Sequence, residues 1–272
     1  MSRKTSALVF VALALSCAFA GTRAQGPPSA VVAAMKNDLK FFDDAAIARE
    51  GDDLKEFINR ADHDHGRTAV MMATIYGHHE LLDKLLTLGA DGKALDHEGH
   101  SAVDAAATLG SIEALNILKN HGLDLWSQSR DGFTPLHRTS WGTNETHLAA
   151  VKYLVEECLV DVNTPDSSGR PATVLAVERG NVAVLKQLLD LGAKVEHMNK
   201  RGDSLLTIAV RKQHAETVDL LLKRGANVLV TDSKGRNLRK LAKLLRSKEI
   251  LKLISDAYAE ATKLHGDTEG EL

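Results

Sequence analysis

The chain has 272 residues, of which 44% are hydrophobic, 26% are charged and only 4% are aromatic. This balance is typical of a soluble folded protein of one or two domains, and it excludes disordered, collagen-like and coiled-coil classes. A core with so few aromatic residues must be built from Ala, Leu, Val and Ile, which favours helices. The net charge of −2 hides an uneven distribution, because residues 36–66 are acidic and residues 200–252 are strongly basic.

The first twenty residues predict a signal peptide. Residues 2–4 read Ser-Arg-Lys, and only apolar or small side chains follow from Ala7 to Ala20. We expect cleavage after residue 20, or alternatively near residue 24, and then a flexible linker over residues 21–37. The apolar run is shorter than the roughly 20 residues that span a bilayer. The sequence therefore predicts a secreted or secretory-lumen protein with no transmembrane segment.

Two other destinations stay open for this N-terminal segment. Residues 16–20 read Ser-Cys-Ala-Phe-Ala, which resembles the Ala-Phe junction of a bipartite plastid presequence, and no acidic residue precedes Asp38. A plastid location is therefore an alternative. In a bacterial host the same segment would direct the chain to the periplasm.

Glycines divide the rest of the chain into repeats. One series follows spacings of 33, 33, 37, 33 and 33 residues, and a second and a third series lie eleven and twenty-three residues after it. A short Ala-rich helix and a longer amphipathic helix fit between these glycines. Such a repeat cannot bury its apolar face alone, so we expect neighbouring repeats to stack into a solenoid. The first series is Gly66, Gly99, Gly132, Gly169, Gly202 and Gly235.

The residues within these repeats carry a family resemblance. Residues 131–137 read DGFTPLH, which resembles the ankyrin signature, and residues 85–91 and 221–227 resemble the end of its second helix. The resemblance covers residues 38–258 and implies an all-α ankyrin-repeat solenoid of about six repeats with short β-hairpin turns. Residues 40–60 fit an N-terminal half-repeat, and residues 259–272 are expected to form a disordered tail.

The third repeat is four residues longer than the others. Three of the extra residues fall in the turn at 142–147, and one falls near Cys158. The turn contains the sequon Asn144-Glu145-Thr146, so Asn144 is a glycosylation candidate if a eukaryotic secretory pathway carries the chain. We expect Cys158, at the end of a second helix, to be buried as a small apolar residue.

The chain contains none of the sequence patterns of common catalytic sites, such as a nucleophile elbow, a Walker loop or a His-Glu-x-x-His helix. We expect no enzymatic activity and no cofactor. The alternative is a metal-binding or redox-active secreted protein that uses His63, His65 and His97 in neighbouring turns. Their spacing matches no compact metal motif, so solvated turn histidines are the expected state.

The ankyrin resemblance implies a protein-binding scaffold and locates its concave face at the turns and at the ends of the first helices. Phe133 and Trp141 are the expected anchors, because aromatic residues dominate binding hot spots. The basic end of the face predicts a protein partner with an acidic segment. Nucleic acid is not an expected partner, and the scaffold is expected to be monomeric. An alternative role is that of a plastid-targeted sorting or chaperone factor. The predicted partner-binding residues are Tyr76, Arg130, Phe133, Trp141, Arg170, Arg179, Lys200, Arg201, Arg211 and Lys212.

Overall fold

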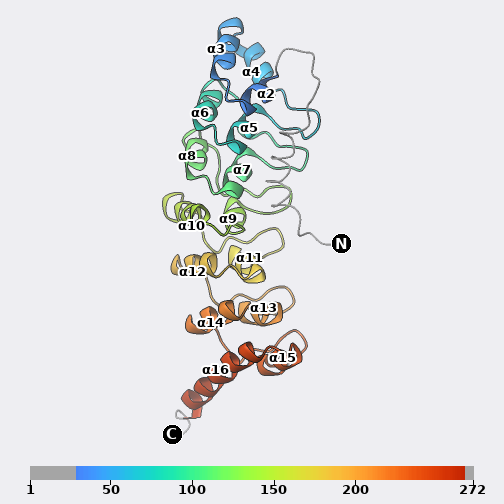
Figure 1. Cartoon of the computed structure of the whole chain (residues 1–272), viewed down its shortest axis with the longest axis vertical. Helices are drawn as coiled ribbons and strands as arrows, with labels where there is room; N and C mark the ends of the chain where they lie inside the picture. Colours follow the sequence, from blue (N-terminus) through green and yellow to red (C-terminus); the bar gives the residue numbers. More distant parts are fainter. Residues whose placement is uncertain (1–28, 267–272) are drawn as a thin grey trace. The chain divides into compact units, whose positions relative to one another are not determined.

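The computed structural model describes residues 29–266 and divides the chain into two compact units. Within these residues the first unit comprises residues 29–154 and the second comprises residues 155–266. Both are built from pairs of helices, and no β-sheet occurs between residues 29 and 266 (Figure 1). The predicted all-α ankyrin-type fold is confirmed, whereas the expected β-hairpins are tight turns, three of which contain an isolated β-bridge.

The first unit holds two parallel rows of helices. In one row α2, α5, α7 and α9 pack in succession, and α6, α8 and α10 form the other row. The helices of this unit are α2 (Ala30–Met35), α3 (Leu39–Ala48), α4 (Gly51–Asn59), α5 (Ala69–Ile75), α6 (His79–Thr87), α7 (Ala102–Leu109), α8 (Ile112–Asn120), α9 (Pro135–Thr139) and α10 (Glu145–Lys152).

The second unit repeats this arrangement. Here α11, α13 and α15 pack in one row, and α12, α14 and α16 pack in the other. A π-helical turn, η1 (Tyr153–Glu157), follows α10. The helices are α11 (Ala172–Arg179), α12 (Val182–Asp190), α13 (Leu205–Lys212), α14 (Ala215–Lys223), α15 (Leu238–Leu244) and α16 (Lys248–Gly266).

Local sequence explains where the first helices begin. Thr68, Ser101, Thr134 and Ser204 each precede such a helix, and each side-chain oxygen accepts a backbone N–H of the first turn. The helices that follow are short and rich in small residues, so their backbones lie close to those of their neighbours. The second helices supply the larger core residues at the predicted positions, all fully buried: Leu85, Leu118, Leu154, Leu188, Leu221 and Ile254.

The structure corrects the expected linker over residues 21–37. Residues 30–35 form α2, which begins at Ser29 and packs against α5, with Val31 and Ala34 buried. The stack therefore has a first helix where the sequence suggested a half-repeat beginning near residue 40. Asn37 takes the left-handed conformation (φ 54°) that glycine adopts in other repeats, which explains why the glycine series gave no signal here. Residues 1–28, with the predicted signal peptide, lie outside the described residues.

The expected tail is corrected as well. Helix α16 continues to Gly266, because residues 259–265 contain no glycine or proline that would end it. The extra residue near Cys158 is absorbed by η1, since a π-turn accommodates one additional residue within a helix. No helix in residues 29–266 is long and apolar enough to cross a bilayer.

Candidate interaction surface

The turns that precede the first helices lie side by side in the first unit. We call three of them fingers: residues 62–67, 96–100 and 129–133. The His97 N–H donates to the carbonyl of His65 at 2.8 Å, and the Arg130 N–H lies 3.5 Å from the carbonyl oxygen of Gly99. Side chains also cover the neighbouring glycines: a Cβ atom on Gly66 would lie 2.4 Å from the His97 ring. The fingers therefore form a continuous edge with little free space between them.

A buried ion network fixes the third finger to the helices beneath it. The Arg138 side chain is 5% exposed and comes from α9. Its Nε donates to Asp104 Oδ1 of α7 at 2.6 Å, and its Nη2 donates to both oxygens of Asp131 at 2.9 and 3.0 Å. The hydroxyl of Ser129 also donates to Asp104. Charge-assisted hydrogen bonds in a buried place are strong and directional, so the network holds this finger in one conformation.

His100 extends the network into the second finger. Its Nε2 lies 3.5 Å from Asp131 Oδ2, and its Nδ1 lies 3.7 Å from Asp96 and 3.5 Å from Glu98. Burial alone would lower the pKa of His100, but the nearby carboxylates of Asp131 and Asp96 raise it to about 9. Burial likewise opposes ionisation of Asp131, but His100 and Arg138 lower the pKa of this carboxyl. His100 is therefore a cation near neutral pH and binds the two fingers together.

An aromatic pair connects the third finger with the chain just after α9. The rings of Phe133 and Trp141 meet edge to face with centroids 5.1 Å apart and an interplanar angle of 70°. Both side chains are half-buried, so each supports the other while part of its surface faces solvent. The structure thus brings together the two predicted anchors. Tyr76, also half-buried, ends α5 and stacks on His78 at 6.0 Å. Arg130 is exposed at the tip of the third finger.

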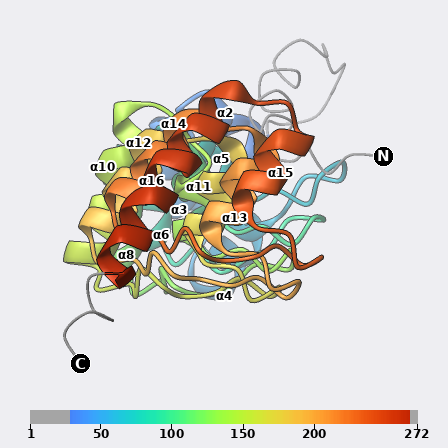
Figure 2. The same cartoon turned by 90° about the horizontal axis from the view of Figure 1, so that it is seen from below.

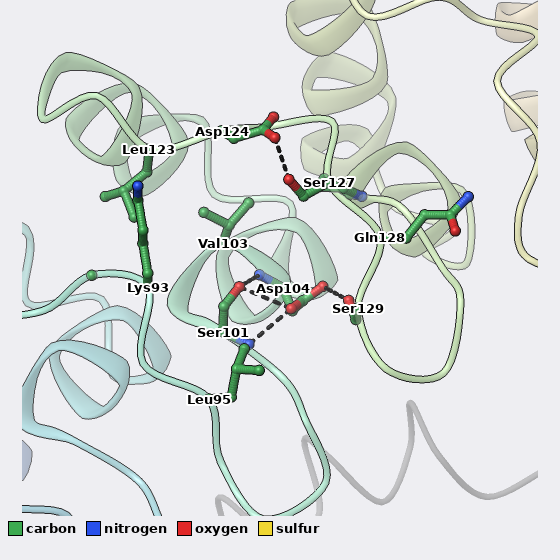
Figure 3. A pocket seen from close by; sticks show the side chains of 12 residues that line it. Lys93, Leu95, Ser101, Val103, Asp104, Leu123, Asp124, Ser127, Gln128 and Ser129 are labelled. Atoms are coloured by element: carbon green, nitrogen blue, oxygen red, sulfur yellow. Dashed lines mark hydrogen bonds between the residues drawn. The ribbon is translucent and has the colours of Figure 1, made fainter.

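A cavity of about 300 Å³ lies between two loops of the same unit (Figure 3). Leu95, Val103 and Leu123 contribute its apolar lining. Ser101, Asp104 and Ser129 form a polar wall joined by hydrogen bonds, as Figure 3 shows. The cavity therefore reaches the carboxylate of Asp104, which is also a partner of Arg138.

Sequence reasoning missed one exposed aromatic residue, Trp126. Its side chain lies in the loop after α8 and is 61% exposed. The corresponding loop positions hold Lys93, Asn163, Glu196 and Leu229 in other repeats. None of these residues is aromatic, and that difference was the available signal.

In the second unit, ion pairs change the interpretation of the predicted basic end. Arg170 Nε donates to Asp166 at 2.9 Å, and Arg211 Nη2 donates to Asp203 at 2.8 Å. These two arginines stabilise their own turns, so their charges are largely neutralised within the chain. Arg170 and Arg211 therefore offer less charge to an acidic partner than the sequence predicted. The remaining predicted cations have exposed side chains: Arg179, Lys200, Arg201 and Lys212.

The other sequence candidates take structural or surface positions. Within residues 29–266 no group of three or more His, Cys, Asp or Glu side chains is arranged to hold a metal ion, and the ring of His97 covers Gly66, so no observation favours the metal alternative of His63, His65 and His97. Cys158 is half-buried rather than fully buried. Asn144 is exposed and caps α10, where its Oδ1 accepts the His147 N–H at 3.1 Å.

Comparison with known proteins identifies the family. A family model of ankyrin repeats, described as three copies, matches residues 32–129, 124–199, 142–232 and 175–263. The chain is 30% identical over 134 residues to a transient receptor potential cation channel subfamily A member 1 homolog of Caenorhabditis elegans, which covers 49% of this chain and 11% of that protein. It is 28% identical over 160 residues to NF-kappa-B inhibitor delta of Mus musculus, covering 58% of this chain and 44% of that protein. The chain thus spans less than half the length of either relative.

The solved structure of the ankyrin repeat domain of Bcl-3 shares the fold, with a TM-score of 0.69 at 24% identity over 85% of this chain and 99% of that one. Ankyrin repeats are in general non-enzymatic modules that bind other proteins through surfaces displayed on a stack of helices. The chain belongs to the ankyrin-repeat family, and it is a protein–protein interaction scaffold.

Proposed function

We propose that the scaffold binds its protein partner through the fingers of the first unit, with Phe133 and Trp141 as the anchors. The observation that carries the proposal is the half-buried pair of Phe133 and Trp141, because Phe133 belongs to the finger that the Asp104–Arg138–Asp131 network holds in place. A surface that is already ordered loses little conformational entropy on binding, and aromatic residues provide large contact areas at few rotatable bonds. The proposed activity is recognition, without catalysis.

The polar groups around the pair suggest the chemistry of the bound segment. Glu98 of the second finger and Arg130 and Asp131 of the third finger, which also contains Phe133, reach the surface. The bound segment would place an apolar side chain against the rings and charged groups of both signs at the rim. In the second unit, exposed Lys200, Arg201 and Lys212 support the further proposal that the partner carries an acidic segment.

The proposal is tested by affinity capture from extracts and medium of the source with the full chain as bait. A Phe133→Ala/Trp141→Ala variant should lose the partner that the parent chain recovers. The matched control is Trp126→Ala, which removes the other, more exposed tryptophan from the same unit. Circular dichroism must show that all baits are folded. Equal recovery by the double variant, or loss of the partner only with Trp126→Ala, would move the binding site away from the fingers.

We further propose the secretory pathway as the compartment, supported by the apolar composition of residues 7–20 and by the exposure of Asn144 in its sequon. A eukaryotic secretory host should then deliver a chain whose gel mobility increases after glycosidase treatment. An Asn144→Gln variant should show no such change. A fluorescent fusion to residues 1–40 that accumulates in plastids would instead support the plastid alternative.

A further inference from the structure

The last repeat carries a run of positive charge that is separate from the fingers of the first unit. From Ser233 to Lys248 the sequence has seven basic residues and no acidic residue. One of the seven, Arg236, pairs with Asp232 at 2.6 Å within its own turn. The other six have exposed side chains and form no ion pair with the carboxylates of residues 29–266: Lys234, Arg239, Lys240, Lys243, Arg246 and Lys248.

Helix α15 displays three of these cations and, at the edge of the same side, an exposed leucine. Leu238, Leu241 and Ala242 are buried against the rest of the second unit. At 3.6 residues per turn, the opposite side of the helix presents Arg239, Lys240, Lys243 and Leu244 within less than half of its circumference. Leu244 is 63% exposed. Figure 2 shows α15 beside α16 at the C-terminal end of the second unit, and no further helix follows in the described chain to cover it.

We propose that this side of α15 docks on an anionic lipid surface. Exposed cations that no carboxylate neutralises repel one another and gain most from an external negative surface. Arg239 also lies over the Tyr258 ring, 5.5 Å from its centroid, but this contact leaves its charge in place. Each Lys or Arg close to an anionic membrane contributes about 1 kcal/mol, so several act together. Leu244 favours a membrane over a soluble polyanion, because an apolar side chain among cations enters the headgroup boundary but gains nothing from a fully hydrated partner. The contact is peripheral, since the apolar side of α15 remains in the protein core.

The experiment is co-sedimentation of the full chain with vesicles of phosphatidylcholine alone and of phosphatidylcholine with phosphatidylserine. The parent chain should bind the anionic vesicles more strongly, and added salt should weaken this preference. Lys240→Gln/Lys243→Gln should lower the anionic partition coefficient about thirty-fold, which corresponds to about 2 kcal/mol. The matched control is Lys200→Gln/Lys212→Gln, which removes two exposed cations from the same unit and should retain most of the binding.

A Leu244→Ser variant separates a membrane from other anionic partners. It should weaken vesicle binding several-fold while leaving retention on a heparin column unchanged. The proposal is overturned if the parent chain shows no preference for anionic vesicles, or if the two double variants lose binding equally. Binding to heparin without binding to vesicles would assign the cations to a soluble polyanion instead.

Discussion

Leu159 occupies a position where four other repeats have glycine. Its backbone takes the left-handed conformation with φ 55°, and its side chain is 84% exposed. The corresponding residues are Gly89, Gly122, Gly192 and Gly225, all with positive φ. A Cβ atom makes this conformation unfavourable, and an exposed side chain offers no packing in return.

Leu159→Gly should therefore raise the free energy of unfolding by about 1 kcal/mol. The effect is measured by urea denaturation followed by circular dichroism. Leu159→Ala is the control, because it removes the exposed side chain but keeps the Cβ atom that causes the strain. An equal gain for both variants would show that the exposed apolar surface, and not the backbone conformation, is responsible.

His100 should make the stability of the first unit depend on pH in the alkaline range. Burial would lower the pKa of His100, but the nearby carboxylates of Asp131 and Asp96 outweigh it and raise the pKa from 6.5 to about 9. A raised pKa in the folded state means that the stabilisation is complete below about pH 6.5 and is lost as pH rises through about 9. Its largest contribution to the free energy of unfolding is about 3 kcal/mol.

The prediction is that unfolding free energy falls more between about pH 6 and about pH 10 in the parent chain than in a His100→Gln variant. Comparing the two slopes removes the contribution of the lysine, tyrosine and cysteine groups that titrate in the same range. Parallel pH profiles for the two proteins would mean that the network does not depend on the charge of His100.

At the scale of elements, the sequence predicted the regular parts of the repeats well. The glycine spacings and the leucines of the second helices located most helix pairs, because these residues satisfy local requirements of turns and core. Helix α2 escaped prediction since Asn37 replaces the expected glycine and the helix has only six residues. The Asp104–Arg138–Asp131 network could not be predicted from the sequence either. Its members come from α7, α9 and a finger, and no other repeat has the same combination of residues.

The packing of α2 against α5 makes a specific prediction. Ala34 is fully buried, so Ala34→Glu places a charge and extra volume into the contact and should lower the free energy of unfolding by about 3 kcal/mol or more. Lys36→Glu, at an exposed position directly after the helix, should change it by less than about 0.5 kcal/mol. Thermal or urea denaturation of the full chain distinguishes the two. Equal stability of both variants would show that residues 30–35 do not pack against α5 and form a linker, as the sequence suggested.

At the scale of the whole molecule, two kinds of surface are assigned to two units. The first unit offers an aromatic pair on an ordered set of fingers, and the second offers exposed cations on α15. The charge of the chain differs between the units in the same way: the acidic residues 36–66 lie in the first unit, and the basic residues 200–252 lie in the second. A scaffold with separate surfaces is suited to holding a protein partner near an anionic membrane.

These surfaces should respond differently to salt. Raising the ionic strength screens exposed charges, so vesicle binding should fall steeply with salt concentration. Partner binding through Phe133 and Trp141 depends mainly on apolar contact, so salt should weaken only the part that an acidic segment contributes, and the dependence should be shallower than that of vesicle binding. The measurement compares both equilibria for the same preparation across one salt series. A steep salt dependence of partner binding would indicate that cations dominate that contact as well.

Hydrogen exchange on the purified complex with the captured partner tests most directly whether the fingers bind it. If they do, the partner should slow amide exchange in residues 96–100 and 129–141, which contain two fingers and the aromatic pair. The loop at residues 121–128, with the exposed Trp126, should exchange at the same rate in the free and the bound chain. Protection of that loop, with unchanged exchange in the fingers, would contradict the proposed binding surface.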